Sequence, residues 1–264
     1  MAGETPPFEC LLYQVEGHVC TVTLNRPEKR NALSAQLVNE LIFALETARD
    51  DLNVRVVVLT GAGKAFCAGA DLSQMSGGGG AESSIPWRGG FVELNLIFTQ
   101  IGKPVIAKIR RYALAGGLAL VCGSTFVIAE DTATFGAPEI DRGIFPMMVM
   151  ASLFRTVSRR KGLEFILSGE RISASDATDM GLITRSVAAE ELDQAVDALA
   201  LKLASKPPAA MRLGLEAFHE QGELGFEEGL RYLEQMLMKC LGTQDAQEGL
   251  MAFLQKRDPV WTGE

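Results

Sequence analysis

The sequence predicts an α/β protein that ends in a helical region. In the first two thirds of the 264-residue chain, short apolar β-type segments alternate with helical segments. After about Ala188 only helical periodicity remains. A composition of 47% hydrophobic and 22% charged residues is typical of a globular protein. We therefore expect a core over residues 1–195 and a helical region over residues 196–264.

The first elements predict a hairpin followed by a helix and a strand. Two β-type segments, Cys10–Val15 and His18–Asn25, flank a turn at Glu16-Gly17. Ser34 is a favourable N-cap for a helix whose apolar residues recur at helical spacing. The apolar run Val54–Thr60 then predicts a buried strand.

The middle of the chain continues the alternation. The low-complexity stretch Ser76–Ser84 predicts a surface loop, and a helix is expected over Gly90–Ile101. A short apolar helix should follow Gly116-Gly117. Further strands are expected at Val105–Ile109, Thr125–Ala129 and Ala133–Gly136.

The C-terminal part predicts four amphipathic helices with no strand between them. Their apolar faces need partners, either the core or neighbouring subunits. Asp245 and Glu248 have the spacing of a capping box at the start of the last helix. The four expected helices are Ala189–Leu203, Ala209–His219, Phe226–Leu241 and Asp245–Lys256.

Charge and hydropathy disfavour two classes of partner. A net charge of −8 argues against nucleic acid, because neutralising phosphates requires clustered Lys and Arg. No apolar run reaches the roughly 18–20 residues that a membrane span needs. The first ten residues lack the basic and apolar regions of a signal peptide. We therefore expect a cytoplasmic protein.

Cysteine and histidine usage disfavours several kinds of site. The five cysteines are scattered and lack C-x-x-C spacing, and there are only two histidines. This pattern argues against a disulfide framework, a zinc site and a Ser-His-Asp triad. We expect no metal.

Two segments rich in small residues are candidates for binding a ligand through the main chain. Gly61–Leu72 matches neither a Walker A loop nor a dinucleotide fingerprint, but its small residues leave N–H groups uncovered where a helix should begin. In Ala113–Ala119, Gly116 and Gly117 let a ligand approach the backbone closely. Such donors favour an anion. On spacing alone, both segments also fit ordinary tight turns.

Glu139 is the candidate acid–base. Pro138 fixes the backbone before it, and the following residues Ile144 and Phe145 make its surroundings apolar. An apolar environment raises the pKa of a carboxyl group toward the range useful for proton transfer. Taken alone, Glu139 also fits an ordinary glutamate at the end of a strand.

Together these segments follow the order and spacing of one family. The chain resembles the crotonase superfamily (enoyl-CoA hydratases and isomerases) along nearly its whole length. Each matching stretch is moderately specific, and six in order are decisive. They are LNRPEKRNALS (24–34), AFCAGADL (65–72), KPVIAKIRRYALAGGLAL (103–120), FGAPEIDRGIFP (135–146), LSGERISASDATDMGLI (167–183) and DAQEGLMAFLQKRDPVW (245–261).

The resemblance implies a spiral of ββα turns closed by C-terminal helices that assemble trimers or hexamers. It implies an acyl-CoA substrate, with CoA as part of the substrate and no separate cofactor. The N–H groups of Ala70 and Gly116 should form an oxyanion hole, with Glu139 as acid–base. The implied substrate-binding residues are Ala68, Asp71, Leu72 and Gly117, with Arg26 and Arg30 near the CoA phosphates.

The chain departs from the family at one catalytic position. Hydratases use two glutamates to hold the added water, and the second falls at Ala119 here. Double-bond isomerases manage with one glutamate at the Glu139 position, and the dienoyl-CoA branch needs carboxylates where Met147 and Ala119 stand. Asp141 is the remaining candidate for a second carboxylate. The sequence therefore favours isomerisation, then hydration; the alternative is a non-catalytic acyl-CoA-binding protein.

Overall fold

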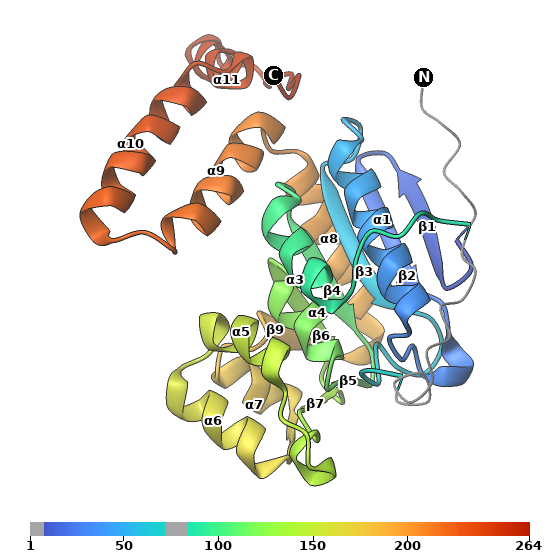
Figure 1. The fold of residues 1–264 in the computed structure, drawn as a ribbon. Helices are drawn as coiled ribbons and strands as arrows, with labels where there is room; N and C mark the ends of the chain where they lie inside the picture. The colour runs from blue at the N-terminus through green and yellow to red at the C-terminus, as the bar shows by residue number, and fades with distance from the viewer. Residues whose placement is uncertain (1–7, 72–83) are drawn as a thin grey trace.

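Within the part of the chain that the structure describes, two β-sheets form the centre, and helices cover them (Figure 1). The computed structural model describes residues 8–71 and 84–264. The larger sheet has the strand order β1-β2-β3-β4-β6-β9 and the smaller has the order β5-β7-β8. Their bounds are β1 (Leu11–Glu16), β2 (Val19–Leu24), β3 (Val56–Gly61), β4 (Val105–Ile109), β5 (Tyr112–Leu114), β6 (Phe126–Glu130), β7 (Thr134–Gly136), β8 (Arg171–Ser173) and β9 (Arg185–Val187).

The strand pairing gives the chain its spiral path. β1 and β2 are antiparallel around Gly17, whose φ of 56° suits the tight turn, and β2, β3, β4, β6 and β9 are parallel. The chain passes twice from the larger to the smaller sheet, from β4 to β5 and from β6 to β7, and a helix follows each time. This succession confirms the expected α/β fold of repeated ββα turns.

Helices cover both faces of the larger sheet. Alternate residues of β3 point to opposite faces, so Val57 and Leu59 join the main core while Val56 and Val58 pack under α8. Ser34 caps α1 as predicted, since its hydroxyl accepts from the Leu37 N–H. The helices are α1 (Ala35–Asp50), α3 (Phe91–Gln100), α4 (Gly117–Gly123), α5 (Met147–Thr156), α6 (Arg159–Ser168), α7 (Ala174–Asp179) and α8 (Leu192–Ala204).

The last three helices form an arm that extends from the body (Figure 1). They are α9 (Pro208–Gln221), α10 (Phe226–Leu241) and α11 (Gln244–Gln255), so the prediction of C-terminal helices is confirmed. Large apolar side chains are exposed on all three, with Phe226 at 85% and Phe253 at 80%. The boundary expected at residue 195 falls inside α8, which packs on the sheet; the arm begins with α9.

The predicted capping box of the last helix is wrong. Thr243 is the N-cap, and its hydroxyl accepts from the Ala246 N–H at 3.1 Å. Asp245 is buried instead and accepts from the Ala209 and Thr262 N–H groups, so it ties the chain end to α9. Glu248 forms an ion pair with Arg257.

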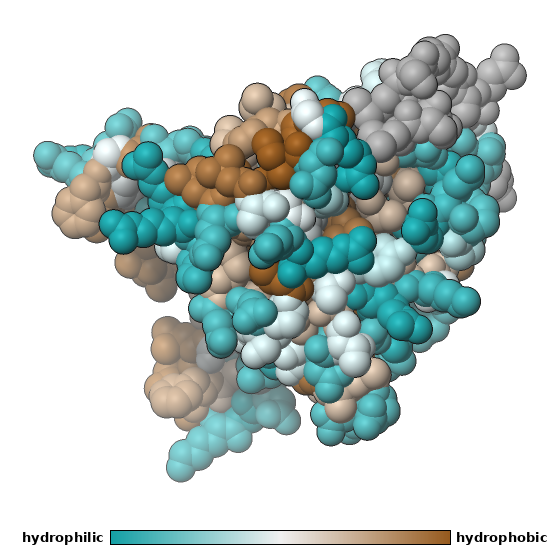
Figure 2. All heavy atoms as spheres, turned by 90° about the horizontal axis from the view of Figure 1, so that it is seen from below, coloured by the Kyte–Doolittle hydropathy of each residue, from teal (hydrophilic) through white to brown (hydrophobic). Residues whose placement is uncertain are grey.

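The helices of the described residues were compared with the length and hydropathy that a membrane span requires. None of the helices within residues 8–71 and 84–264 is both long and apolar enough to cross a bilayer. Seen from below, hydrophobic groups lie among mostly hydrophilic side chains (Figure 2).

The loop expected over Ser76–Ser84 lies outside the described residues except for Ser84.

Candidate active site

The segment that carries Ala70 is fixed by pairing with residue 33. The Leu33 N–H donates to the Gly69 carbonyl at 2.8 Å, and the Asp71 N–H donates to the Leu33 carbonyl at 3.0 Å. Ala70 lies between these two bonds, in a parallel bridge with Leu33. Its own N–H has no acceptor among the described residues and therefore faces away from the bridge.

The segment that carries Gly116 is fixed by the β5–β7 pairing. The Ala115 N–H donates to the Gly136 carbonyl at 2.8 Å, and the carbonyls of Ala115 and Gly116 accept from the first residues of α4. Within the described part of the chain, the Gly116 N–H has no acceptor either. This segment thus leaves a second backbone donor available.

The two donor segments touch. A methyl group added at Gly69 would lie 2.6 Å from the Ala115 Cβ and 3.3 Å from the Gly116 nitrogen. Gly69 and Ala115 both have positive φ, 97° and 51°, and each directly precedes a donor residue. The structure therefore brings Ala70 and Gly116 together, and two fixed N–H groups of this kind can stabilise charge that develops on an oxygen atom.

Glu139 follows the strand that contacts this turn. It starts the short 3-10 helix Ile140–Arg142 just after β7, and its carbonyl accepts from the Ile144 N–H at 3.0 Å. Its Oε2 atom is shielded from solvent and has no hydrogen-bond partner in the described residues. Burial raises the pKa of the Glu139 carboxyl, and the nearby Arg142 charge only partly opposes that shift. A carboxyl group of this kind is suited to exchanging a proton with a ligand.

The positions considered for a second carboxylate do not supply one at Glu139. Ala119 lies in α4 with 2% of its surface exposed and belongs to the main core. Asp141 is exposed, and its Oδ1 lies 2.9 Å from where a methyl group on Gly169 would be. Met147 is 64% exposed at the start of α5. Glu139 is thus the carboxylate that the geometry favours.

Arg26 has a structural partner in the site. Its guanidinium forms an ion pair with Asp71 at 2.9 Å, with 14% and 8% of the two side chains exposed. A second guanidinium nitrogen donates to the Ala32 carbonyl. These contacts hold the end of the Ala70 segment in place, a role that the sequence interpretation of Arg26 missed.

Arg30 lies on the surface near two further cations. With Lys64 and Arg111 it lines a hollow of about 690 Å³ whose wall includes Thr132 and Thr134. Its carbonyl accepts from the Ala68 N–H at 3.0 Å, which links this hollow to the Ala70 segment. Lys64 and Arg111 follow strands of the larger sheet, a signal that the sequence interpretation did not use.

The remaining site predictions concern Gly117, Leu72 and metals. Gly117 is the first residue of α4, and a methyl group there would lie 3.0 Å from the Cys67 Cβ. Leu72 lies outside the described residues. Among the residues that the structure places, no group of three or more His, Cys, Asp and Glu is arranged to hold a metal ion.

Comparison with known proteins identifies the family. Residues 14–264 match the family model described as enoyl-CoA hydratase/isomerase. A solved structure, enoyl-CoA hydratase from Mycobacterium smegmatis, has a TM-score of 0.88 and 34% identity, covering 96% of this chain and 99% of that chain. The chain therefore belongs to the enoyl-CoA hydratase/isomerase family, within the crotonase superfamily.

Curated relatives carry more than one enzyme name. A probable enoyl-CoA hydratase of Rhizobium meliloti (strain 1021) is 37% identical over 252 residues, 95% of this chain and 96% of that protein. A carnitinyl-CoA dehydratase of Salmonella typhimurium is 35% identical over 253 residues, 94% and 96% of the two chains. Because similar relatives bear different names, the reaction has to be argued from the residues of the site.

Proposed function

We propose that the protein binds an enoyl-CoA thioester with its carbonyl oxygen between the Ala70 and Gly116 N–H groups. Removing or adding a proton at the carbon next to a thioester moves negative charge onto that oxygen. Two fixed donors stabilise the resulting enolate, each by roughly 2.7–4 kcal/mol in comparable sites. The CoA phosphates would lie near the cations Arg30, Lys64 and Arg111, which line one hollow.

Glu139 is the acid–base in the proposed reaction. It removes a proton from C2 of the acyl group and returns it to C4, so that a double bond moves from the 3- to the 2-position. Its shielded Oε2 and raised pKa support proton exchange with a bound ligand. Isomerisation needs only this carboxylate, whereas hydration in this family uses a second one at the position of buried Ala119. Hydration is therefore the second activity to test.

The alternative is an acyl-CoA-binding protein without catalysis. The observation that favours it is the apolar packing at Ala119, since one of the two hydratase carboxylates is missing. The retained Glu139, three residues after the Gly136 carbonyl that accepts from the Ala115 N–H, supports the enzyme.

Product analysis separates these functions. The protein is incubated with but-3-enoyl-CoA and but-2-enoyl-CoA in separate reactions, and products are resolved by chromatography and mass spectrometry. The proposal expects conversion of the 3-enoyl to the 2-enoyl thioester, with little 3-hydroxyacyl product. The variant Ala119→Glu should increase hydration, up to the roughly 10²–10⁴-fold of one positioned proton-transfer group, if the core accommodates the side chain. Rapid hydration by the parent protein would refute the isomerase preference, and binding without turnover would support the alternative.

A further inference from the structure

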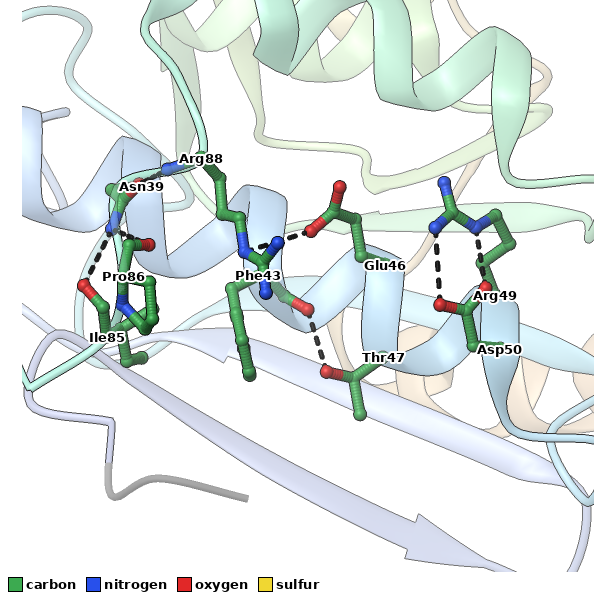
Figure 3. A network of polar contacts seen from close by, with 9 residues as sticks. All are labelled: Asn39, Phe43, Glu46, Thr47, Arg49, Asp50, Ile85, Pro86 and Arg88. Atoms are coloured by element: carbon green, nitrogen blue, oxygen red, sulfur yellow. Dashed lines mark hydrogen bonds and ion pairs between the residues drawn. The ribbon is translucent and has the colours of Figure 1, made fainter. Parts of the chain in front are cut away.

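A buried asparagine in α1 holds the segment that leads into α3. Asn39 is 2% exposed, and its Nδ2 atom lies 3.4 Å from the Ile85 carbonyl oxygen and 3.2 Å from that of Pro86. Its Oδ1 atom accepts from the Arg88 N–H. Figure 3 shows the three contacts radiating from this one side chain. One amide group thus fixes the main chain of residues 85–88 against α1.

The side chain of Arg88 fixes the same segment a second time. Its guanidinium carbon lies 5.0 Å from the centroid of the Phe43 ring, and its Nε atom lies 3.4 Å from a carboxylate oxygen of Glu46. Asn39, Phe43 and Glu46 lie along one side of α1 (Figure 3), as their spacing of four and three residues requires. We call these contacts of Asn39 and Arg88 the α1 clamp.

The residues held by the α1 clamp lead directly into the start of α3. Gly90 is the N-cap, and its N–H donates to the Glu93 side chain at 2.7 Å. At Gly89, where φ is 152°, a methyl group would lie 2.4 Å from the Glu93 Cγ. The glycine therefore lets the carboxylate close over the helix end, and this closure fixes where Phe91, the first helical residue, lies.

Phe91 touches one of the two donor residues. A methyl group added to Gly116 would lie 3.2 Å from the Phe91 Cζ atom and 3.4 Å from Leu33 Cδ1. The Phe91 ring is only partly buried and packs on the main core. Its edge therefore lies against the residue whose N–H is proposed to bind the thioester oxygen.

We infer that Phe91, positioned by the α1 clamp, limits the bulk of the acyl group next to the thioester carbonyl. This inference rests on the proposed function, because it places the carbonyl at Gly116. An acyl chain unbranched at C2 passes the ring edge, whereas a C2 methyl group meets it. A single methylene in an apolar pocket changes discrimination by roughly 10–200-fold, so one well-placed ring is sufficient to give a measurable preference for unbranched chains.

Binding of two saturated thioesters tests the role of Phe91. Butyryl-CoA and isobutyryl-CoA have the same number of carbon atoms and differ in the branch at C2. Calorimetry on the parent protein should show tighter binding of butyryl-CoA, and Phe91→Ala should shift the ratio of the two affinities toward isobutyryl-CoA by roughly 10-fold or more. An unchanged ratio in a folded Phe91→Ala protein would overturn the inference.

A matched phenylalanine on the same helix is the control. Phe98 is buried, and it packs where a methyl group on Gly123 would lie 2.7 Å from its ring. Phe98→Leu removes core packing at the far end of α3 and should lower thermal stability without changing the affinity ratio. A similar change of the ratio in Phe98→Leu would show that the effect is general loosening, and the inference would fail.

The positioning role of Asn39 has its own test. Asn39→Ala should shift the affinity ratio in the same direction as Phe91→Ala, and it should have no additional effect when Phe91 is already alanine. The control Asn53→Ala removes an exposed asparagine that donates to the Gly17 carbonyl and should leave the ratio unchanged. Additive effects of Asn39→Ala and Phe91→Ala would refute positioning through Phe91.

These ligands separate the inference from the proposed chemistry. Saturated thioesters have no double bond to move or hydrate, so their affinity ratio does not depend on catalysis by Glu139. Turnover without any effect of Phe91 would refute the inference alone. Failure of the parent protein to bind either thioester would refute acyl-CoA binding and the inference with it.

Discussion

Gly69→Ala is the substitution that most directly tests the donor geometry. The new methyl group would lie 2.6 Å from the Ala115 Cβ and 3.0 Å from the Leu114 carbonyl oxygen. Contacts this short force the segments of Ala70 and Gly116 apart, because neither obstacle is the end of a flexible side chain. A displaced donor no longer points at the position where the negative oxygen forms.

Gly69→Ala should lower the free energy of unfolding for two reasons. A non-glycine residue in the left-handed region costs roughly 1–2 kcal/mol, and overpacking typically costs about 1–3 kcal/mol more. Gly17→Ala is the matched control, because Gly17 also has positive φ but no atom within 4 Å of the added methyl group. Gly17→Ala should therefore lose only about 1–2 kcal/mol of unfolding free energy and keep full activity. For Gly69→Ala we expect a loss of about 2–5 kcal/mol.

Activity and stability have to be measured on the same samples. Urea unfolding gives the free energy, and turnover of the enoyl-CoA substrate is measured where both variants are folded. Loss of one donor should lower kcat by about 10²–10³-fold in Gly69→Ala. A folded Gly69→Ala protein with the parent kcat would refute the donor role of this turn.

The remaining predictions concern Glu139 and the helical arm. Glu139→Gln should abolish turnover with little change in acyl-CoA affinity, because the amide keeps the shape but cannot take a proton. Since burial raises the pKa of Glu139 above its ordinary 4.5, the parent rate should fall with decreasing pH in a limb lying above that value. For the same reason Glu139→Gln should have a higher free energy of unfolding than the parent at neutral pH, and this difference should disappear in acid, where Glu139 is protonated in both states. We also propose that the arm assembles a trimer or a dimer of trimers; Phe226→Glu with Phe253→Glu should dissociate it in sedimentation experiments, and a monomeric, active parent would contradict this.

The fold could be predicted where the local pattern decides the structure. Ser34 caps its helix, and Phe226–Leu241 is helical over the predicted range, because N-cap chemistry and apolar periodicity act within a few turns. The capping box at Asp245 failed because that carboxylate accepts N–H groups from α9 and the chain end, which local sequence does not reveal. The strands β5, β8 and β9 also escaped prediction, because segments of three residues carry little periodicity.

The candidate site was predicted from family spacing more than from chemistry. Ala70 and Gly116 have no reactive side chain. The small residues around them indicated that main-chain N–H groups were uncovered, and the resemblance singled out these two. The α1 clamp left no such signal, because Asn39 lies about 50 residues from the main-chain groups it binds. For Arg26 the sequence suggested a phosphate ligand. Its buried ion-pair partner Asp71 became visible only in three dimensions.

The spacing of the site follows from how successive turns of the spiral stack. Cys67 forms a parallel bridge with Ala113, and Ala113 pairs in turn with Phe135. Each member of this stacked trio precedes a residue of the candidate site by three or four residues: Ala70, Gly116 and Glu139. Because parallel register fixes the trio, the segments that carry these three residues leave the sheet at neighbouring positions although the chain separates them widely. A one-residue insertion after any member of the trio would therefore displace the candidate site residue that follows it while the sheets kept their pairing. The fixed offsets are thus what relates the three segments of the candidate site to one another.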